Sequence, residues 1–248
     1  MRNWIALMLL ALPCSAVPAQ APIAANTVAA PDLSGLWVVS NRSSRGNLDE
    51  DFAPLKPEQY LTGKGKSALT GVRPALDPSS MCLPSIPRHL SGPYPIEIVQ
   101  RPGRIAMLFE WDTVFRIIYT DARQHPDPEA DQRYMGHAIG HWDGATLIVD
   151  TTNFNGKAWL EGSGLPMSDK AHLTEWYSLT EGGKTLQLIV KMEDPEYLSR
   201  PVWRKYLYNL KNDWAISEYF CAEGNRDNAF QQKEGQPGSI QKDDVIEE

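Results

Sequence analysis

GHAIGHWDGATLIVDTTNF, residues 136–154, is the stretch that decides the fold, because it has the pattern of a β-hairpin. The pair Asp143-Gly144 suits the two central residues of a type I′ turn, in which both have positive φ. A two-residue loop sets the register of the two strands, which predicts His137 opposite Asp150. The sequence therefore predicts an antiparallel hairpin on which a histidine faces a carboxylate.

The same register divides the hairpin into two faces, because successive side chains of a strand point to opposite sides. One face is mostly apolar, as packing requires. It carries Ala138, Gly140, Trp142, Ala145, Leu147 and Val149. The other face is mixed and is the first candidate for a site. It carries His137, Ile139, His141, Thr146, Ile148 and Asp150.

Further short strands, separated by turn residues, are expected on both sides of this hairpin. They are residues 32–40, 96–101, 104–110, 113–120, 171–180, 184–191, 202–211 and 214–221. Nearly all connections are short, which favours antiparallel neighbours, and a long meander avoids exposed edges by closing on itself. The sequence thus predicts an all-β fold, an antiparallel meander closing into a barrel of about 8–10 strands.

The region between the first two expected strands has a different character. Residues 41–95 are polar and rich in proline, and they are expected to be irregular apart from a short helix within residues 57–69. This irregular N-terminal segment is therefore an insertion into the meander rather than a separate domain.

Several short motifs spread over nearly the whole chain are specific when taken together. They are DLSGLW at 32–37, CLPSIPR at 82–88, PYPIEIVQ at 93–100, HP at 125–126, the hairpin, and WLEGSGLPMSDKAHLTE at 159–175. With them the chain resembles a family of uncharacterised secreted bacterial β-rich proteins of lipocalin- or calycin-like type. The resemblance implies a calycin-like β-barrel and brings no reaction. That family more often has arginine at the position of His141 and histidine at that of Met167.

The first 19 residues have the features of a secretory signal peptide. Arg2 is followed by the apolar run Trp4–Leu12 and by small residues, which predicts cleavage after Ala19. The run is shorter than the roughly 20 residues that cross a membrane. We therefore expect a periplasmic or secreted protein without membrane insertion; a form lipid-anchored at Cys14 is the alternative.

The remaining chain divides by composition into three parts. Residues 20–31 form a loose lead-in, residues 32–221 a single β-barrel domain, and residues 222–248 a polar, charged and disordered tail. The net charge of −7 and the lack of a basic run argue against nucleic acid and anionic membranes as partners. The sequence does not define an oligomeric state.

Two cysteines, Cys82 and Cys221, remain after removal of the signal peptide. An even number of cysteines in an oxidising compartment predicts a disulfide, which would join the start of the β-rich region to its end. Two separate buried thiols are the alternative.

His137 and Asp150 are the first candidate catalytic residues. A carboxylate that holds one imidazole nitrogen makes the other a better base. A solvated polar pair of little consequence is the alternative. His141 lies about 13 Å from His137 along an extended strand, too far to share a metal ion. No metal and no cofactor are expected, and the sequence has no phosphate-binding loop or serine elbow.

Glu175 lies between Leu173 and Tyr177 on one face of an expected strand, where burial would make it a general acid. The alternative is a structural partner for Arg116 or Arg204. Arg116 itself is surrounded by apolar residues and must be paired, with an anionic ligand or with a carboxylate of the fold.

Other candidates are polar or aromatic residues within expected strands, and they are assigned to ligand binding. They are Arg116, Glu97, His172, Trp176 and His141. His125 lies in a polar loop and is expected at the rim of a site or free at the surface.

Two functions are compatible with these features. The first is an exported barrel that binds a small, partly apolar or aromatic molecule in its cavity, which the number of tryptophans and tyrosines favours. The second is a cofactor-independent isomerase, lyase or hydrolase that uses the His137–Asp150 pair. The sequence does not decide whether the protein is an enzyme.

Overall fold

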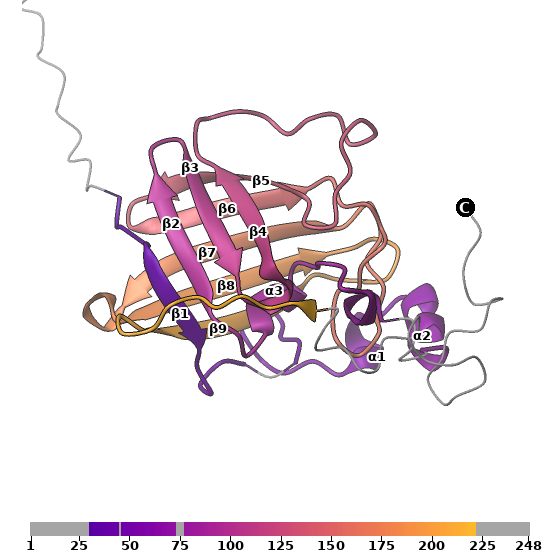
Figure 1. Cartoon of the computed structure of the whole chain (residues 1–248). Coiled ribbons are helices and arrows are strands. Elements are labelled where there is room, and N and C mark those ends of the chain that lie inside the picture. Colours follow the sequence, from indigo (N-terminus) through magenta and orange to yellow (C-terminus); the bar gives the residue numbers. More distant parts are fainter. Residues whose placement is uncertain (1–29, 45, 73–76, 222–248) are drawn as a thin grey trace, which may run out of the picture.

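In a computed structural model, which describes residues 30–44, 46–72 and 77–221, nine strands form one closed barrel (Figure 1). They are β1 Gly35–Val39, β2 Ile96–Arg101, β3 Arg104–Phe109, β4 Val114–Tyr119, β5 His137–Asp143, β6 Thr146–Thr152, β7 His172–Thr180, β8 Thr185–Glu193 and β9 Val202–Leu210. The all-β barrel is confirmed. The signal peptide, nearly all of the lead-in and the tail lie outside the described residues.

The strands alternate as the sequence pattern requires. On β6 the side chains of Leu147, Val149 and Thr151 are buried, while those between them are partly exposed. The inward face is thus the apolar face of the predicted hairpin. His137 and Asp150 lie on the outer face, outside the barrel.

The register of the hairpin differs from the prediction by two residues. Asp143 pairs with Thr146, so the turn residues are Gly144 and Ala145, and His137 pairs with Thr152 instead of Asp150. Gly144 has a φ of 55°, so glycine supplies the positive φ that the first central position of the turn requires. A shift of two residues preserves the faces because side chains alternate with period two.

One junction of the barrel departs from the predicted antiparallel meander. β4 and β5 are parallel and pair only through Ile118 with Ala138 and Tyr119 with Ile139, whereas the other eight neighbouring pairs of the described barrel are antiparallel. The long connection 120–136 allows this by returning the chain to the starting end of β4. The result is a short seam with few backbone hydrogen bonds.

The predicted strand at 214–221 is wrong. β9 already pairs with β1 to close the barrel, so no free edge remains for another strand. Instead, side chains hold this segment: Ser217 N donates to Glu110 Oε2, and Tyr219 exchanges hydrogen bonds with Thr113. It ends at the Cys82–Cys221 disulfide, which is confirmed.

The helices of the described residues are short and lie outside the sheet. They are α1 Pro57–Tyr60, α2 Gly63–Thr70 and α3 Arg88–Ser91, with single turns at Pro78–Met81, Trp111–Thr113 and Glu181–Gly183. The helix expected within 57–69 is divided because Leu61 is extended. None of these helices has the length and apolar character needed to cross a membrane.

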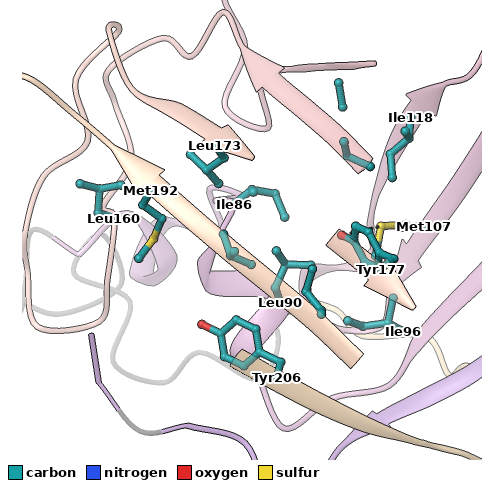
Figure 2. Close-up of a cluster of buried hydrophobic side chains, with 14 of the residues drawn as sticks. Ile86, Leu90, Ile96, Met107, Ile118, Leu160, Leu173, Tyr177, Met192 and Tyr206 are labelled. Carbon is teal, nitrogen blue, oxygen red and sulfur yellow. Dashed lines mark hydrogen bonds between the residues drawn. The ribbon is translucent and has the colours of Figure 1, made fainter. Parts of the chain in front are cut away.

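The irregular segment 77–92 fills one end of the barrel. Ile86 and Leu90 are fully buried and belong to the same core as Leu173 and Tyr206 from the strands (Figure 2). The hydroxyl of Tyr208 donates to the carbonyl of Leu90 and fixes this segment to β9. The proline-rich insertion thus completes the core.

Side chains fill the interior of the barrel. A cavity between Trp37, Tyr177 and Tyr208 has no volume that a water molecule could occupy. A second, beside Leu160 and Arg204, is equally tight. These two cavities are too small for the ligand that the sequence analysis expected inside the barrel.

Candidate functional site

A chain of histidines and carboxylates crosses the outer face of β5, β6 and β7. His125, from the 120–136 connection, places Nε2 2.8 Å from Asp150 Oδ1 and Nδ1 2.9 Å from His137 Nδ1. On the other side, His172 Nε2 lies 2.5 Å from Asp150 Oδ2. We call His125, His137, Asp150 and His172 the outer cluster.

The predicted direct pair of His137 and Asp150 is wrong. Within the described residues no hydrogen bond or ion pair joins the two, because the actual register places Thr152 opposite His137. His125 fills the space between them and contacts both. From the sequence, His125 was expected at the rim of a site or free at the surface, because loop residues have no register from which a contact can be worked out.

His137 is enclosed although it lies on the outer face. Its ring stacks on that of Tyr119, with the ring centroids 5.4 Å apart, and the Arg123 guanidinium lies 3.6 Å from the centroid of the same Tyr119 ring. Only 6% of His137 is exposed. Burial lowers the pKa of His137, and the neighbouring His125 and Arg133 lower it further. His137 therefore favours its neutral form.

The pKa of His172 moves in the opposite direction. Its hydrogen bond to Asp150 is the main cause that raises this pKa, against the effect of burial, and Glu193 adds to the increase. Burial raises the pKa of Asp150, but the hydrogen bonds from His172 and His125 outweigh burial and lower it overall. One carboxylate thus separates a histidine that favours the cation from one that favours the neutral form.

The Nδ1 atoms of His125 and His137 form a hydrogen bond only if one of them carries a proton and the other accepts it. If His125 donates its Nε2–H to Asp150, its Nδ1 accepts from the Nδ1–H of His137. His137 Nε2 then keeps its lone pair. In this arrangement the Asp150 carboxylate orients the His125 ring, and His125 in turn orients the ring of His137.

A groove of about 290 Å³ opens beside His137, along the seam between β4 and β5. It is lined by Phe115, Arg116, Ile117, Tyr119, Arg133, Tyr134, Met135, Gly136, His137 and Ala138. The parallel pairing ends after two residue pairs, and residues 133–137 run apart from β4. We call this feature the β4–β5 groove.

Arg116 is among the residues that line the groove, and its buried side chain binds groups in the barrel interior. Its guanidinium donates to both oxygens of Glu175, at 2.9 and 2.5 Å, and to the hydroxyl of Thr151. Tyr177 also donates to Glu175. Burial opposes the charge on Arg116, but Glu175 holds its pKa above the ordinary value. Of the two alternatives for Glu175, the geometry matches the structural partner of Arg116.

The remaining candidates do not converge on one place. His141 is exposed near the hairpin turn and pairs with Ile148. Trp176 stacks on Trp203 at 5.4 Å on the outer face. Glu97 lines a separate cavity of about 330 Å³ with Lys211 and Trp214.

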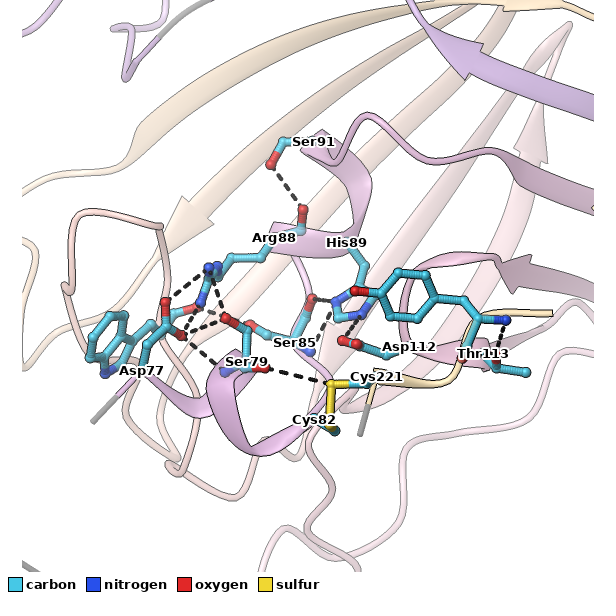
Figure 3. A network of polar contacts seen from close by, with 12 residues as sticks. Asp77, Ser79, Cys82, Ser85, Arg88, His89, Ser91, Asp112, Thr113 and Cys221 are labelled. Atoms are coloured by element: carbon cyan, nitrogen blue, oxygen red, sulfur yellow. Dashed lines mark hydrogen bonds and ion pairs between the residues drawn. A yellow bond between two sulfur atoms is a disulfide. The ribbon is translucent and has the colours of Figure 1, made fainter. Parts of the chain in front are cut away.

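Sequence analysis missed a second histidine–aspartate pair. His89 Nε2 lies 3.1 Å from Asp112 Oδ2, both side chains are 1% exposed, and His89 Nδ1 contacts the backbone of Ser85 (Figure 3). The ring of His89 also stacks on Trp111 at 4.6 Å. No local spacing links residues 23 positions apart in irregular segments, so the pair depends on tertiary structure.

Comparisons with known proteins found matches only among solved structures. No protein-family model matches the chain, and a comparison with curated proteins found no match. Among solved structures, 25 chains match, including one described as "REP1-NXSQ fatty acid transporter". That match has 12% identity and a TM-score of 0.36, and it covers 74% of this chain and 98% of the other. The lipocalin-like, secreted bacterial family therefore stays a prediction.

Proposed function

We propose that this protein binds a small, partly apolar or aromatic molecule in the β4–β5 groove. The observation that carries the proposal is the contrast between the filled interior and the groove of about 290 Å³ on the barrel wall. Phe115 supports it, because this phenylalanine lines the groove and is 65% exposed. A groove of this size fits a molecule of about one aromatic ring with its substituents.

The proposed place of action is the periplasm or the medium. The predicted cleavage after Ala19 and the Cys82–Cys221 disulfide both support it, because disulfides persist in oxidising compartments. Binding there requires no cofactor.

The binding proposal is tested by a thermal-shift screen of small aromatic compounds, followed by titration calorimetry of the compounds that stabilise the protein. Phe115→Ala should weaken binding about tenfold, since an aromatic wall contributes about 1.4 kcal/mol. Trp214→Ala is the matched control, because Trp214 is 51% exposed and lines the separate cavity beside Glu97. A loss confined to Trp214→Ala would contradict the groove.

A second function, cofactor-independent acid–base catalysis, is favoured by the chain from Asp150 through His125 to His137. In this proposal His137 Nε2 takes a proton from a substrate in the groove, and His125 with Asp150 stabilises the cation that forms. An isomerase, lyase or hydrolase reaction is compatible with such a base. Glu175 is left out, because it is fully buried and its oxygens are bonded to Arg116, Thr151 and Tyr177.

This second function is tested with any compound that binds the groove and is turned over. His125→Asn should reduce kcat about 100-fold, the lower end of general-base effects, with little change in affinity. His141→Asn is the control, because His141 is exposed and outside the cluster. Unchanged turnover in His125→Asn and in His137→Gln would exclude the mechanism and leave binding as the function.

A further inference from the structure

The charged side chains of the β4–β5 groove all have the same sign. Arg116 and Arg133 line it, and no aspartate or glutamate is among its lining residues. The carboxylates that neutralise them, Glu175 and Asp131, do not line the groove. A ligand in the groove therefore meets the exposed guanidinium of Arg133 and no carboxylate acceptor among the lining residues.

Arg116 has one buried N–H donor without a hydrogen-bond partner among the described residues. Its two terminal nitrogens are bonded to Glu175 and Thr151, whereas its Nε has no partner among the described residues and is buried. The Arg116 side chain is only 2% exposed. A buried donor without a partner destabilises the fold. Because this N–H is shielded from solvent, it is not a contact for a ligand in the groove.

Arg133 is the accessible cation of the groove. Its Nε and Nη2 donate to Asp131 at 2.7 and 2.5 Å, and its side chain is 50% exposed. An exposed ion pair of this kind is weak because solvent screens it. A ligand carboxylate can therefore share the planar guanidinium with Asp131 or replace it.

The apolar side of the groove is also selective. Tyr119 already contacts two groups through its ring, the guanidinium of Arg123 and the stacked ring of His137. Phe115 remains largely exposed. The groove thus offers one exposed aromatic surface, Phe115, and one exposed guanidinium, Arg133.

We infer that the ligand of the β4–β5 groove is a small aromatic or apolar carboxylate, whose body packs on Phe115 and whose oxygens are recognised by Arg133. The inference rests on the proposed binding function of the groove and adds the charge of the ligand. A cation is disfavoured because it would enter beside two positive charges.

Three probes of nearly equal shape test the inference: phenylacetate, phenylacetamide and phenethylamine. Titration calorimetry with the full chain should give an affinity for phenylacetate about 10-fold higher than for phenylacetamide, and no measurable binding of phenethylamine. Arg133→Gln should weaken phenylacetate about 5- to 10-fold and change phenylacetamide by less than about 2-fold. Arg42→Gln is the control, because Arg42 forms an ion pair of equal exposure, 49%, with Glu181.

The outcomes distinguish a failure of the inference about ligand charge from a failure of the proposed binding function. Equal affinity for phenylacetate and phenylacetamide, with both weakened by Phe115→Ala, would overturn the inference and leave groove binding in place. Phenylacetate binding that neither Phe115→Ala nor Arg133→Gln affects would overturn both. A lack of saturable binding by all three probes would likewise overturn the inference.

Discussion

The outer cluster and the His89–Asp112 pair use the same two residue types in opposite settings. Both side chains of His89–Asp112 are 1% exposed, and aromatic rings and backbone groups surround the histidine. In the outer cluster, Asp150 is 40% exposed at the side chain and the groove opens beside His137. A buried pair without space beside it stabilises the fold, whereas a pair beside a groove can meet a ligand.

The comparison shows that a histidine–carboxylate contact does not define a site by itself. His89 Nδ1 is occupied by Ser85 and its Nε2 by Asp112, so neither ring nitrogen is free for a substrate. Within the described part of the chain, His137 has one hydrogen-bonding partner, through Nδ1, and it faces a groove. The free nitrogen and the open space together distinguish the candidate site.

The largest expected effect concerns the disulfide Cys82–Cys221, which lies near the buried pair (Figure 3). Cys82 and Cys221 are 139 residues apart, so replacing both with serine should lower the free energy of unfolding by up to about 5 kcal/mol in the chain-entropy view. Urea unfolding of the double variant checks this value. If stability fell by less than about 1 kcal/mol, the bridge would not matter for the buried centre.

The next effect compares the two centres directly. His89→Ala removes a buried ring and leaves the Asp112 carboxyl without its partner, which should cost about 3 kcal/mol. His172→Ala should cost no more than about 1 kcal/mol, because the His172 side chain is 37% exposed and its ion pair is screened. The urea unfolding midpoints of the two variants measure this difference in stability. Equal losses would contradict the distinction between the buried His89–Asp112 pair and the outer cluster.

A smaller effect is the change in folding stability with pH that His172 and His137 cause. The pKa of His172 is raised above 6.5, so its stabilisation is complete below that pH and is lost as pH rises through the pKa of the folded state. The pKa of His137 is lowered, so its stabilisation is present above pH 6.5 and is lost as pH falls. Each contribution should be below about 1 kcal/mol.

Unfolding midpoints between pH 5 and 8, compared for the parent chain, His172→Gln and His137→Gln, separate these two contributions. The difference between parent and His172→Gln should shrink toward high pH, and that for His137→Gln should shrink toward low pH. Opposite trends would mean that the outer cluster does not have the charge distribution described above.

The smallest effect concerns the edge of the outer cluster. Glu193 lies 3.4 Å from His172 Nδ1 and supports its raised pKa only after Asp150. Glu193→Gln should therefore lower the pKa of His172 slightly, by much less than Asp150→Asn does. Histidine resonances followed by NMR across pH compare the two variants, and a larger shift from Glu193→Gln would reverse the order of partners.

Much of the barrel follows from local patterns. Alternation along residues 136–154 correctly placed Leu147 and Val149 on one face of the hairpin and His137 and Asp150 on the other, whereas only the structure showed that the first face is inward. The cysteine pair was also predictable, because its chemistry depends on number and compartment. The partners of His137 were not, since a turn placed one residue away changes every cross-strand pair.

The sequence by itself predicted the all-β barrel, the two faces of the hairpin and the disulfide, because period-two alternation and cysteine chemistry are local properties. Tertiary structure alone decided the parallel seam of β4 and β5, the position of His125 between His137 and Asp150, and the burial of His89 against Asp112. These contacts join loops to strands across long stretches of chain. Such contacts depend on packing in three dimensions, which leaves no periodic trace in the sequence.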